Sequence, residues 1–171
     1  MIGEWFKYVV LFFALLFLQL FVLNNIQFSG YINPFAYILL ILVLPLNTPR
    51  WLVMMTGFIL GLSIDIYTRT PGMHASAAVF IGFVRRRILT ILSPREGYEF
   101  GAQPTVSDMG FLWFFAYSSI IIVLHHTWLF LIEDFTLSHV GHVFVKVVLS
   151  SLFTLTVIFI IQLLSYKPTK G

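Results

Sequence analysis

The sequence predicts an all-α integral membrane protein that forms a single transmembrane domain over residues 1–171. Of its 171 residues, 59% are apolar and only 10% are charged, whereas a typical soluble domain carries roughly 25% charged residues. The mean hydropathy is +0.95, and the apolar residues are gathered into long runs. At about 20 residues per span plus loops, the chain accommodates about six transmembrane helices and no extramembrane domain.

The composition also excludes several classes of protein. There is no cysteine, which excludes disulfides, thiolate zinc sites and thiol catalysis. The low charge and the 18% aromatic content exclude a disordered chain. The net charge of +3 fits cytoplasmic loops of a membrane protein. We expect no nucleic-acid partner, because no basic face exists outside the apolar runs.

The first expected span covers about residues 5–24, interrupted only by Lys7 and Gln19. This run is too long for the core of a signal peptide. It is followed by Asn24-Asn25-Ile26 rather than by a small-x-small cleavage site, so we expect an uncleaved first helix.

The second and third expected spans, about residues 33–46 and 51–67, are separated by a turn that contains Pro45 and Pro49. The apolar run between Pro34 and Pro45 has ten residues, which cover about 15 Å of a hydrocarbon core of about 30 Å. Either the second helix extends backwards and spans, or residues 34–67 form a short hairpin that dips into the membrane. We favour two tilted spans, and both interpretations return the chain to the same side.

The fourth expected span, about residues 73–92, follows Pro71-Gly72 and contains Arg85, Arg86 and Arg87. Three adjacent arginines cannot all face lipid at depth. We expect them to lie at the interface or to extend to it, as a cytoplasmic basic anchor beyond a membrane exit near Phe83.

A polar linker over residues 93–109 leads to the fifth and sixth expected spans, about residues 110–132 and 143–164. If the N- and C-termini are cytoplasmic, eight of the ten Lys and Arg residues fall inside, and only Arg69 and Lys146 fall outside. This asymmetry supports that orientation.

Small residues mark one face of each of the third and fourth spans. Gly57 and Gly61 form a GxxxG motif, which lets another backbone approach closely. A second small-residue face begins after Gly72 and includes Ala78 and Gly82. We expect the two faces to pack together; the alternative is a docking groove for a helix of another protein.

Asp65 lies four residues after Gly61 and therefore on the same helix face. Because it is near the outer end of its span and close to Arg69, we expect it to cap, to pair with Arg69, or to accept hydrogen bonds from the turn before Gly72. A proton relay or transport site and a contact with a partner remain alternatives.

The histidines do not form a recognisable metal site. His139 and His142 have one-turn spacing near Glu133 and Asp134, but there is no HExxH motif, so we expect no metal. His125 and His126 lie near the middle of the fifth span and point about 100° apart. We expect one of them to face the bundle and to bond to a carbonyl, Gln19 or Ser118.

No constellation for catalysis is present. The sequence contains no GxSxG, P-loop or GxGxxG motif. We therefore expect no catalytic residue and no cofactor.

The block from Gly57 to Asp65, followed by Gly72 and a small-residue helix, resembles the G-x-x-x-G-L-x-x-D block of the rod shape-determining protein MreD family. The length, the number of expected spans, the Asn33-Pro34 start of the second span and the Leu18-Gln19-Leu20 end of the first also resemble that family. The layout is similar over nearly the whole chain, and the specific motif extends from about residue 33 to 82. The polar linker has no clear counterpart.

The resemblance implies a function in cell shape. MreD-like proteins are non-enzymatic components of the bacterial inner membrane that belong to the rod complex, or elongasome, for lateral peptidoglycan synthesis. They bind the bitopic protein MreC and associate with the synthase machinery and the MreB filament. Their fold is distantly similar to the substrate-binding subunits of energy-coupling-factor transporters. The resemblance carries over Gly57, Gly61 and Asp65 as motif positions and no catalytic residue.

The alternative function is a small-molecule carrier, a transporter subunit that binds its substrate between helices. The residues that could line such a pocket near the outer face are Asp65, Tyr67, His74, Trp128 and His139. Two observations argue against this function. Such subunits usually contact their transporter through an AxxxA-type face of the first helix, whereas Ala14 is the only alanine in the first expected span. In addition, few polar residues lie deep in the spans, where a substrate site would need them. The scaffold is therefore the preferred expectation.

Overall fold

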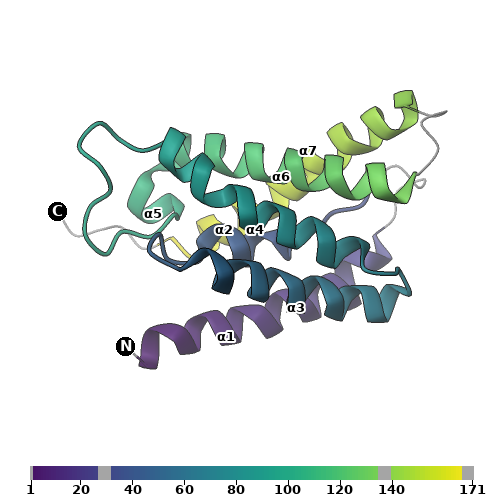
Figure 1. Cartoon of the computed structure of the whole chain (residues 1–171), viewed down its shortest axis with the longest axis horizontal. Coiled ribbons are helices and arrows are strands. Elements are labelled where there is room, and N and C mark those ends of the chain that lie inside the picture. Colours follow the sequence, from purple (N-terminus) through teal and green to yellow (C-terminus); the bar gives the residue numbers. More distant parts are fainter. Residues whose placement is uncertain (1, 27–31, 135–139, 167–171) are drawn as a thin grey trace.

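The computed structural model describes residues 2–26, 32–134 and 140–166 (Figure 1). Their secondary structure is entirely helical, without a strand. The first element, α1 (Ile2–Phe17), continues through a π-helical turn, η1 (Leu18–Val22), and a 3₁₀ turn, η2 (Leu23–Asn25). The remaining helices are α2 (Ile38–Val43), α3 (Arg50–Thr68), α4 (Met73–Ile91), α5 (Val106–Met109), α6 (Phe111–Glu133) and α7 (Val140–Leu164).

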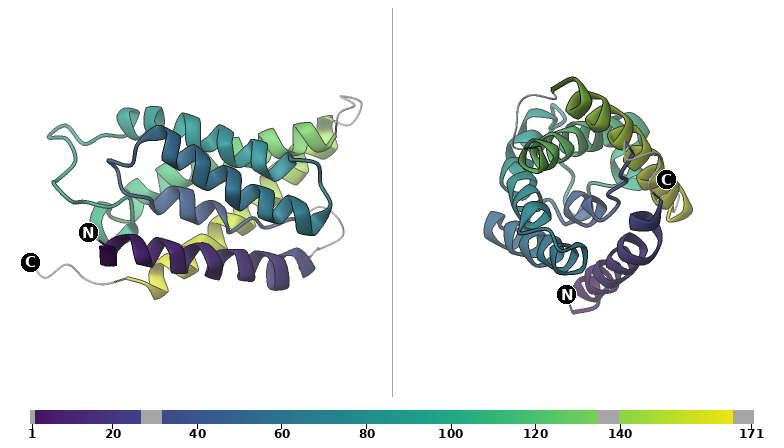
Figure 2. Two further views of the ribbon diagram at one scale, coloured as in Figure 1. Left: turned by 60° about the horizontal axis from the view of Figure 1, so that its bottom comes forward. Right: turned by 90° about the vertical axis from the view of Figure 1, so that its right-hand side faces the viewer.

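The long helices form a ring around α2. Figure 2, viewed along the bundle, shows α1, α3, α4, α6 and α7 surrounding the short α2. Helices α1, α3 and α6 run away from the end at which α1 begins, and α4 and α7 return to it (Figure 1). The turn between α2 and α3 and the linker before α5 also lie at that end. The turn between α3 and α4 lies at the opposite end.

Four helical segments are long and apolar enough to cross a membrane. They are Trp5–Asn25, Arg50–Thr68, Phe111–Glu133 and Val140–Leu164. Large apolar side chains cover their outward surfaces; Phe13 is 62% exposed and Ile66 is 74% exposed, as suits contact with lipid. The all-helical character predicted from the composition is therefore confirmed, and these four segments have the length and hydropathy that a membrane span needs. Helix α4 is as long as α3 but carries three arginines in its second half.

The second expected helix, over residues 33–46, is much shorter than predicted and lies in the core. Helix α2 has six residues, or about 9 Å of helix, and none of them is more than 5% exposed. Pro34 disfavours a helical conformation in the residue before it. Leu44 has extended backbone angles (φ −54°, ψ 144°) before Pro45 and ends the helix. The segment is therefore a short buried helix rather than a tilted span.

The polar linker is attached to the bundle by hydrogen bonds. The hydroxyl of Tyr98 donates to the carbonyl of Leu89 at 2.6 Å, and the ammonium of Lys7 in α1 donates to the side-chain carbonyl of Gln103 at 3.1 Å. Partial burial raises the pKa of Tyr98 to about 12, so this hydroxyl keeps its proton. These bonds attach parts of the linker to the helices, while the loop between α4 and α5 projects beyond the end of the bundle (Figure 1).

Candidate functional site

The extended segment before α2 carries backbone polar groups into the bundle, where side chains of other helices satisfy them. The amide of Gln19, which lies in the π turn, donates to the carbonyl of Pro34 at 3.0 Å. The backbone N–H of Phe35 donates to the Thr154 hydroxyl of α7 at 3.0 Å. Non-helical backbone at membrane depth is tolerated only where protein satisfies it in this way. These side chains therefore make the interior position of α2 possible.

The other end of α2 is capped by a buried arginine. Arg85 of α4 is 2% exposed, and its Nη2 donates to the carbonyl of Leu44 and, at 3.5 Å, to that of Leu42. Its Nε donates to the hydroxyl of Tyr117 at 2.9 Å. That hydroxyl donates in turn to Leu42 at 3.2 Å. A cation at the C-terminus of a helix interacts favourably with the helix dipole and with the unsatisfied carbonyls.

This position of Arg85 corrects the expectation that all three adjacent arginines lie at the interface. Arg86 and Arg87 are exposed, as expected of a basic anchor, but Arg85 points into the bundle. The reason is the helical period of about 100° per residue, which turns one residue of the three inward. There, the carbonyls at the end of α2 accept its hydrogen bonds.

A buried cluster of histidine and tyrosine lies at the other end of α2. The hydroxyl of Tyr37 is 2.6 Å from Nε2 of His125 and 3.2 Å from Nδ1 of His74. The ring of Phe35 packs edge-on against His74 at a centroid distance of 5.0 Å. Nδ1 of His125 is buried and has no partner among the described residues. The cluster joins α2, α4 and α6.

Both histidines of the pair in α6 are fully buried, although only one was expected to face the bundle. Nδ1 of His126 lies 2.8 Å from the carbonyl of Ile122, and its Nε2 lies 3.2 Å from the Thr154 hydroxyl. Within the described ranges, no group of three or more His, Asp or Glu could hold a metal ion. His139, part of the weak metal pattern, lies outside the described residues.

Asp65 ties the end of α3 to the start of α4. It is 3% exposed, and its Oδ1 accepts hydrogen bonds from the Thr70 hydroxyl at 2.6 Å and from the backbone N–H of His74 at 3.0 Å. Its Oδ2 accepts from the N–H of Ala75 at 2.9 Å. A carboxylate on the first N–H groups of a helix is stabilised by the helix dipole. The expected hydrogen bonds from the turn are therefore present.

The turn between α3 and α4 depends on left-handed backbone conformations. Arg69 has φ +58° and Gly72 has φ +77°, a region that glycine adopts without steric cost. Arg69 serves as the C-terminal cap of α3 and is exposed, whereas the carboxylate of Asp65 points at α4.

The glycine faces bring the backbones of α3 and α4 into direct contact. A Cβ on Gly57 would lie 2.9 Å from the carbonyl oxygen of Ala78, and one on Gly61 would lie 2.6 Å from the backbone of Ala75. A Cβ on Gly82 would lie 3.3 Å from the backbone of α3. The small-residue face is therefore used for packing within the chain, which leaves no groove there for another protein.

A cavity of about 380 Å³ lies at the end of the bundle where α3 turns into α4. The described residues that line it come from η2, the segment before α2, the α3–α4 turn with the helix ends beside it, and α6. They include Asn24, Asn33, Tyr67, His74 and Glu133. Asn24 and Glu133 contribute polar atoms that sequence reasoning did not place at this site. Its lining is a mixture of polar and apolar side chains.

Only part of the expected carrier pocket is brought together there. Tyr67 and His74 line the cavity, and the carboxylate of Asp65 is occupied by the start of α4. Trp128 lies elsewhere, stacked on Phe80 at a centroid distance of 4.4 Å. His139 lies outside the described residues.

A second hollow, an apolar groove of about 400 Å³, lies between α6 and α7. Its lining is almost entirely aliphatic and aromatic: Val123, Thr127, Leu131, Val140, Val143, Phe144, Val147, Val148, Ser151, Leu152 and Leu155. Ser151 is 3% exposed, and its hydroxyl has no hydrogen-bond partner within the described ranges. A polar atom without a partner in an apolar groove of a membrane protein is costly.

Sequence reasoning missed Tyr37 and Thr154, which hold the interior segment. A signal was present in α7, where Ser150 and Thr154 are four residues apart and therefore share one helix face. Hydroxyl side chains on one face of a transmembrane helix indicate contact with polar groups of another element. The segment that needs them could not be identified until Pro34 was seen to lie inside the bundle.

Comparisons of the chain with family models, with curated proteins and with solved structures found no match. The function therefore has to be inferred from the geometry of these sites and from the resemblance in the sequence.

Proposed function

We propose that the chain is a non-enzymatic membrane scaffold of a rod-type complex in the bacterial inner membrane. It would bind the transmembrane helix of an MreC-like bitopic protein and support lateral peptidoglycan synthesis. Contacts with the synthase and with an MreB-like filament would be direct or would run through that partner. The proposal combines the sequence resemblance with the groove between α6 and α7.

The observation that carries helix binding is the Ser151 hydroxyl. The groove around it is long, apolar and open to the side of the bundle. A lipid tail would fill the groove but would leave this hydroxyl without a partner, because hydrocarbon offers no hydrogen bond. The Ser151 hydroxyl is buried beneath the lining of the groove. A partner helix that presents a backbone carbonyl, or a serine, threonine or asparagine side chain, would fill the groove and would pair with Ser151 after a shift of the side chains that cover it.

The glycine face of α3 supports the same assignment by exclusion. The GxxxG motif on this face could also have bound a helix of another protein. Helix α4 of the same chain covers it, however, at backbone contact distance. The motif therefore stabilises the scaffold, and docking is left to outer surfaces such as the α6–α7 groove.

The experiment is site-specific crosslinking in the native membrane. A photo-crosslinking residue replaces Leu152, which is 58% exposed and lines the groove, or Ile160, which is 52% exposed on α7 outside it. We expect the Leu152 position to crosslink to a single-span protein with a large periplasmic part, and the Ile160 position not to do so. Crosslinks to lipid alone at both positions would contradict the proposal.

The hydroxyl itself is tested by a matched pair of substitutions. Ser151→Ala removes the proposed interhelical bond and should weaken capture of the partner about three- to tenfold, whereas Ser151→Leu should block the groove. Thr156→Leu is the control, because Thr156 is exposed on α7, outside the groove, and its hydroxyl donates to the carbonyl of Leu152 in its own helix.

The cavity beside His74 favours a second candidate, a substrate-binding subunit of a small-molecule transporter. It has the size and the mixed polar and apolar lining of a small-ligand site. When the chain is purified from its native membrane after crosslinking, recovery of ATPase subunits or of a tightly bound small molecule, without a single-span partner, would favour this function over the scaffold.

A further inference from the structure

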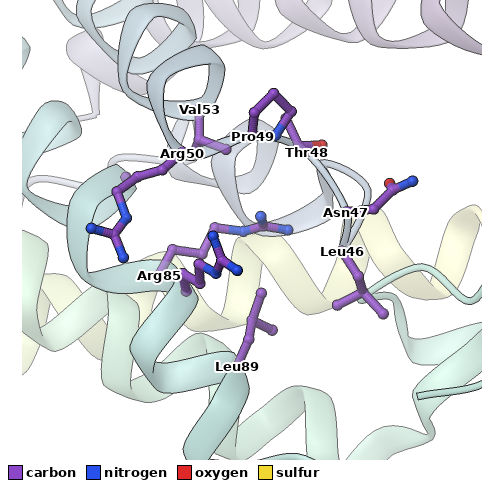
Figure 3. Close-up of a pocket in the computed structure, with 10 residues that line it drawn as sticks. Leu46, Asn47, Thr48, Pro49, Arg50, Val53, Arg85 and Leu89 are labelled. Atoms are coloured by element: carbon purple, nitrogen blue, oxygen red, sulfur yellow. The ribbon is translucent and has the colours of Figure 1, made fainter. Parts of the chain in front are cut away.

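A small pocket lies at the opposite end of the bundle from the His74 cavity, under the turn between α2 and α3. It has a volume of about 140 Å³, and its polar lining includes Asn47, Thr48, Arg50, Arg85 and Arg86. In Figure 3 the residues of the turn curve over the pocket, with Arg50 and Arg85 approaching from the helices. The pocket is separate from the groove and the cavity discussed above.

Three positive charges meet at this pocket without a carboxylate to balance them. Arg85 is 2% exposed, and its hydrogen bonds use Nε and Nη2 on uncharged acceptors, namely two carbonyls and a phenol. In the described part of the chain, the ion pair that forms is Lys146 with Glu133, which involves none of these arginines. The carbonyls at the end of α2 offset part of the cost of burying this cation, and a bound anion would offset more of it.

Two further features make the pocket suitable for an oxyanion. The hydroxyl of Thr48 is buried and has no hydrogen-bond partner in the part of the chain that the structure describes. Helix α3 begins at Arg50 without a side-chain cap, so its first N–H groups and its dipole favour a negative charge. The guanidinium of Arg50 is held over the ring of Phe83 at 5.2 Å from its centroid, which limits its freedom. Hydroxyl, helix terminus and guanidinium groups are the usual donors to phosphate.

We propose that this pocket binds the phosphate group of an anionic membrane lipid. The phosphate would accept hydrogen bonds from the arginines and the Thr48 hydroxyl, and the acyl chains would extend along the lipid-facing surface. The lipid is favoured over free phosphate because the pocket is at the end of membrane-spanning α3. There, Trp51, 66% exposed, is suited to the membrane interface.

The test uses the full chain, released from mixed vesicles of phosphatidylcholine and phosphatidylglycerol and examined by native mass spectrometry. The wild type should retain phosphatidylglycerol in preference to phosphatidylcholine. Arg86→Gln and Arg50→Gln should each lower that preference about three- to tenfold, as expected for loss of one charged contact to phosphate. Arg87→Gln is the matched control, because Arg87 is exposed next to Arg86 but does not line the pocket.

The outcomes separate the alternatives. An equal fall for Arg86→Gln and Arg87→Gln would show diffuse attraction to a basic surface and would overturn the site. No preference in the wild type would do the same. Displacement of phosphatidylglycerol by added inorganic phosphate, with direct binding of that ion, would overturn the assignment to lipid. Arg86 and Arg50 are exposed, so both variants should fold, and an unchanged melting temperature checks this.

Discussion

At the residue scale, two buried charges hold the interior of the bundle by capping helices other than their own. The carboxylate of Asp65 accepts the first N–H groups of α4, and the guanidinium of Arg85 donates to the last carbonyls of α2. An anion at an N-terminus and a cation at a C-terminus both agree with the helix dipole. Each charge is therefore stabilised by backbone rather than by an ion pair.

Substitutions at Asp65 test this role. Asp65→Asn keeps one acceptor oxygen but directs an amide N–H₂ at a backbone N–H, so we expect a loss of about 1–3 kcal/mol in the free energy of unfolding. Asp65→Leu leaves both backbone donors unsatisfied and should cost more. The measurement is thermal or denaturant unfolding in detergent. Equal losses for the two variants would indicate that the charge itself matters, as for a proton relay.

At the element scale, the contact of α3 with α4 is determined by glycines. The face of α3 at Gly57 and Gly61 has no space for a side chain, because the backbone of α4 occupies it. Close backbone approach increases van der Waals contact, which is the main attraction between helices in a membrane. The two packed helices place Asp65 near one end of the bundle and Arg85 toward the other.

Gly61→Ala is expected to push α3 and α4 apart, because its Cβ would lie 2.6 Å from the backbone of Ala75. Overpacking of this kind costs about 1–3 kcal/mol or more, and Gly61→Leu should lower the folded yield further. Gly141→Ala is the control, because Gly141 lies in α7 with open space around it. The readout is the melting temperature and the monodisperse yield; no change in Gly61→Leu would refute close packing.

At the scale of the whole molecule, the number of membrane crossings depends on the short α2 and on the polar α4. Four helical segments have the length and hydropathy of spans, and α4 completes the ring with them (Figure 2). Its buried face includes Arg85, which contacts carbonyls instead of lipid. A helix that hides its charge inside a bundle can cross a membrane despite a modest hydropathy.

The topology is measurable because the chain has no cysteine. Single substitutions Arg69→Cys and Glu96→Cys place a thiol at exposed positions on either side of α4. We expect a membrane-impermeant maleimide to label Arg69→Cys in intact cells, and Glu96→Cys only after permeabilisation. Labelling of both from the same side would mean that α4 does not cross the membrane.

Much of the fold could be predicted from local pattern alone. Long apolar runs with few charges require helices in lipid, since every backbone polar group must be satisfied within the segment. The spacing of Gly57, Gly61 and Asp65 on one face follows from the helical period. These features depend on neighbours in sequence, so the sequence by itself determined the long helices and the small-residue face, and it placed Asp65 beside the turn without selecting its role as a cap.

The tertiary structure decided what the interior contains. An apolar run such as that of α2 suits lipid and a protein core equally, and only the arrangement of Gln19, Thr154 and Arg85 around it selects the core. The same arrangement turns Arg85 away from its exposed neighbours and creates the pocket under the α2–α3 turn. These are contacts between residues far apart in the chain, and their energies depend on which polar groups meet, which no local period encodes.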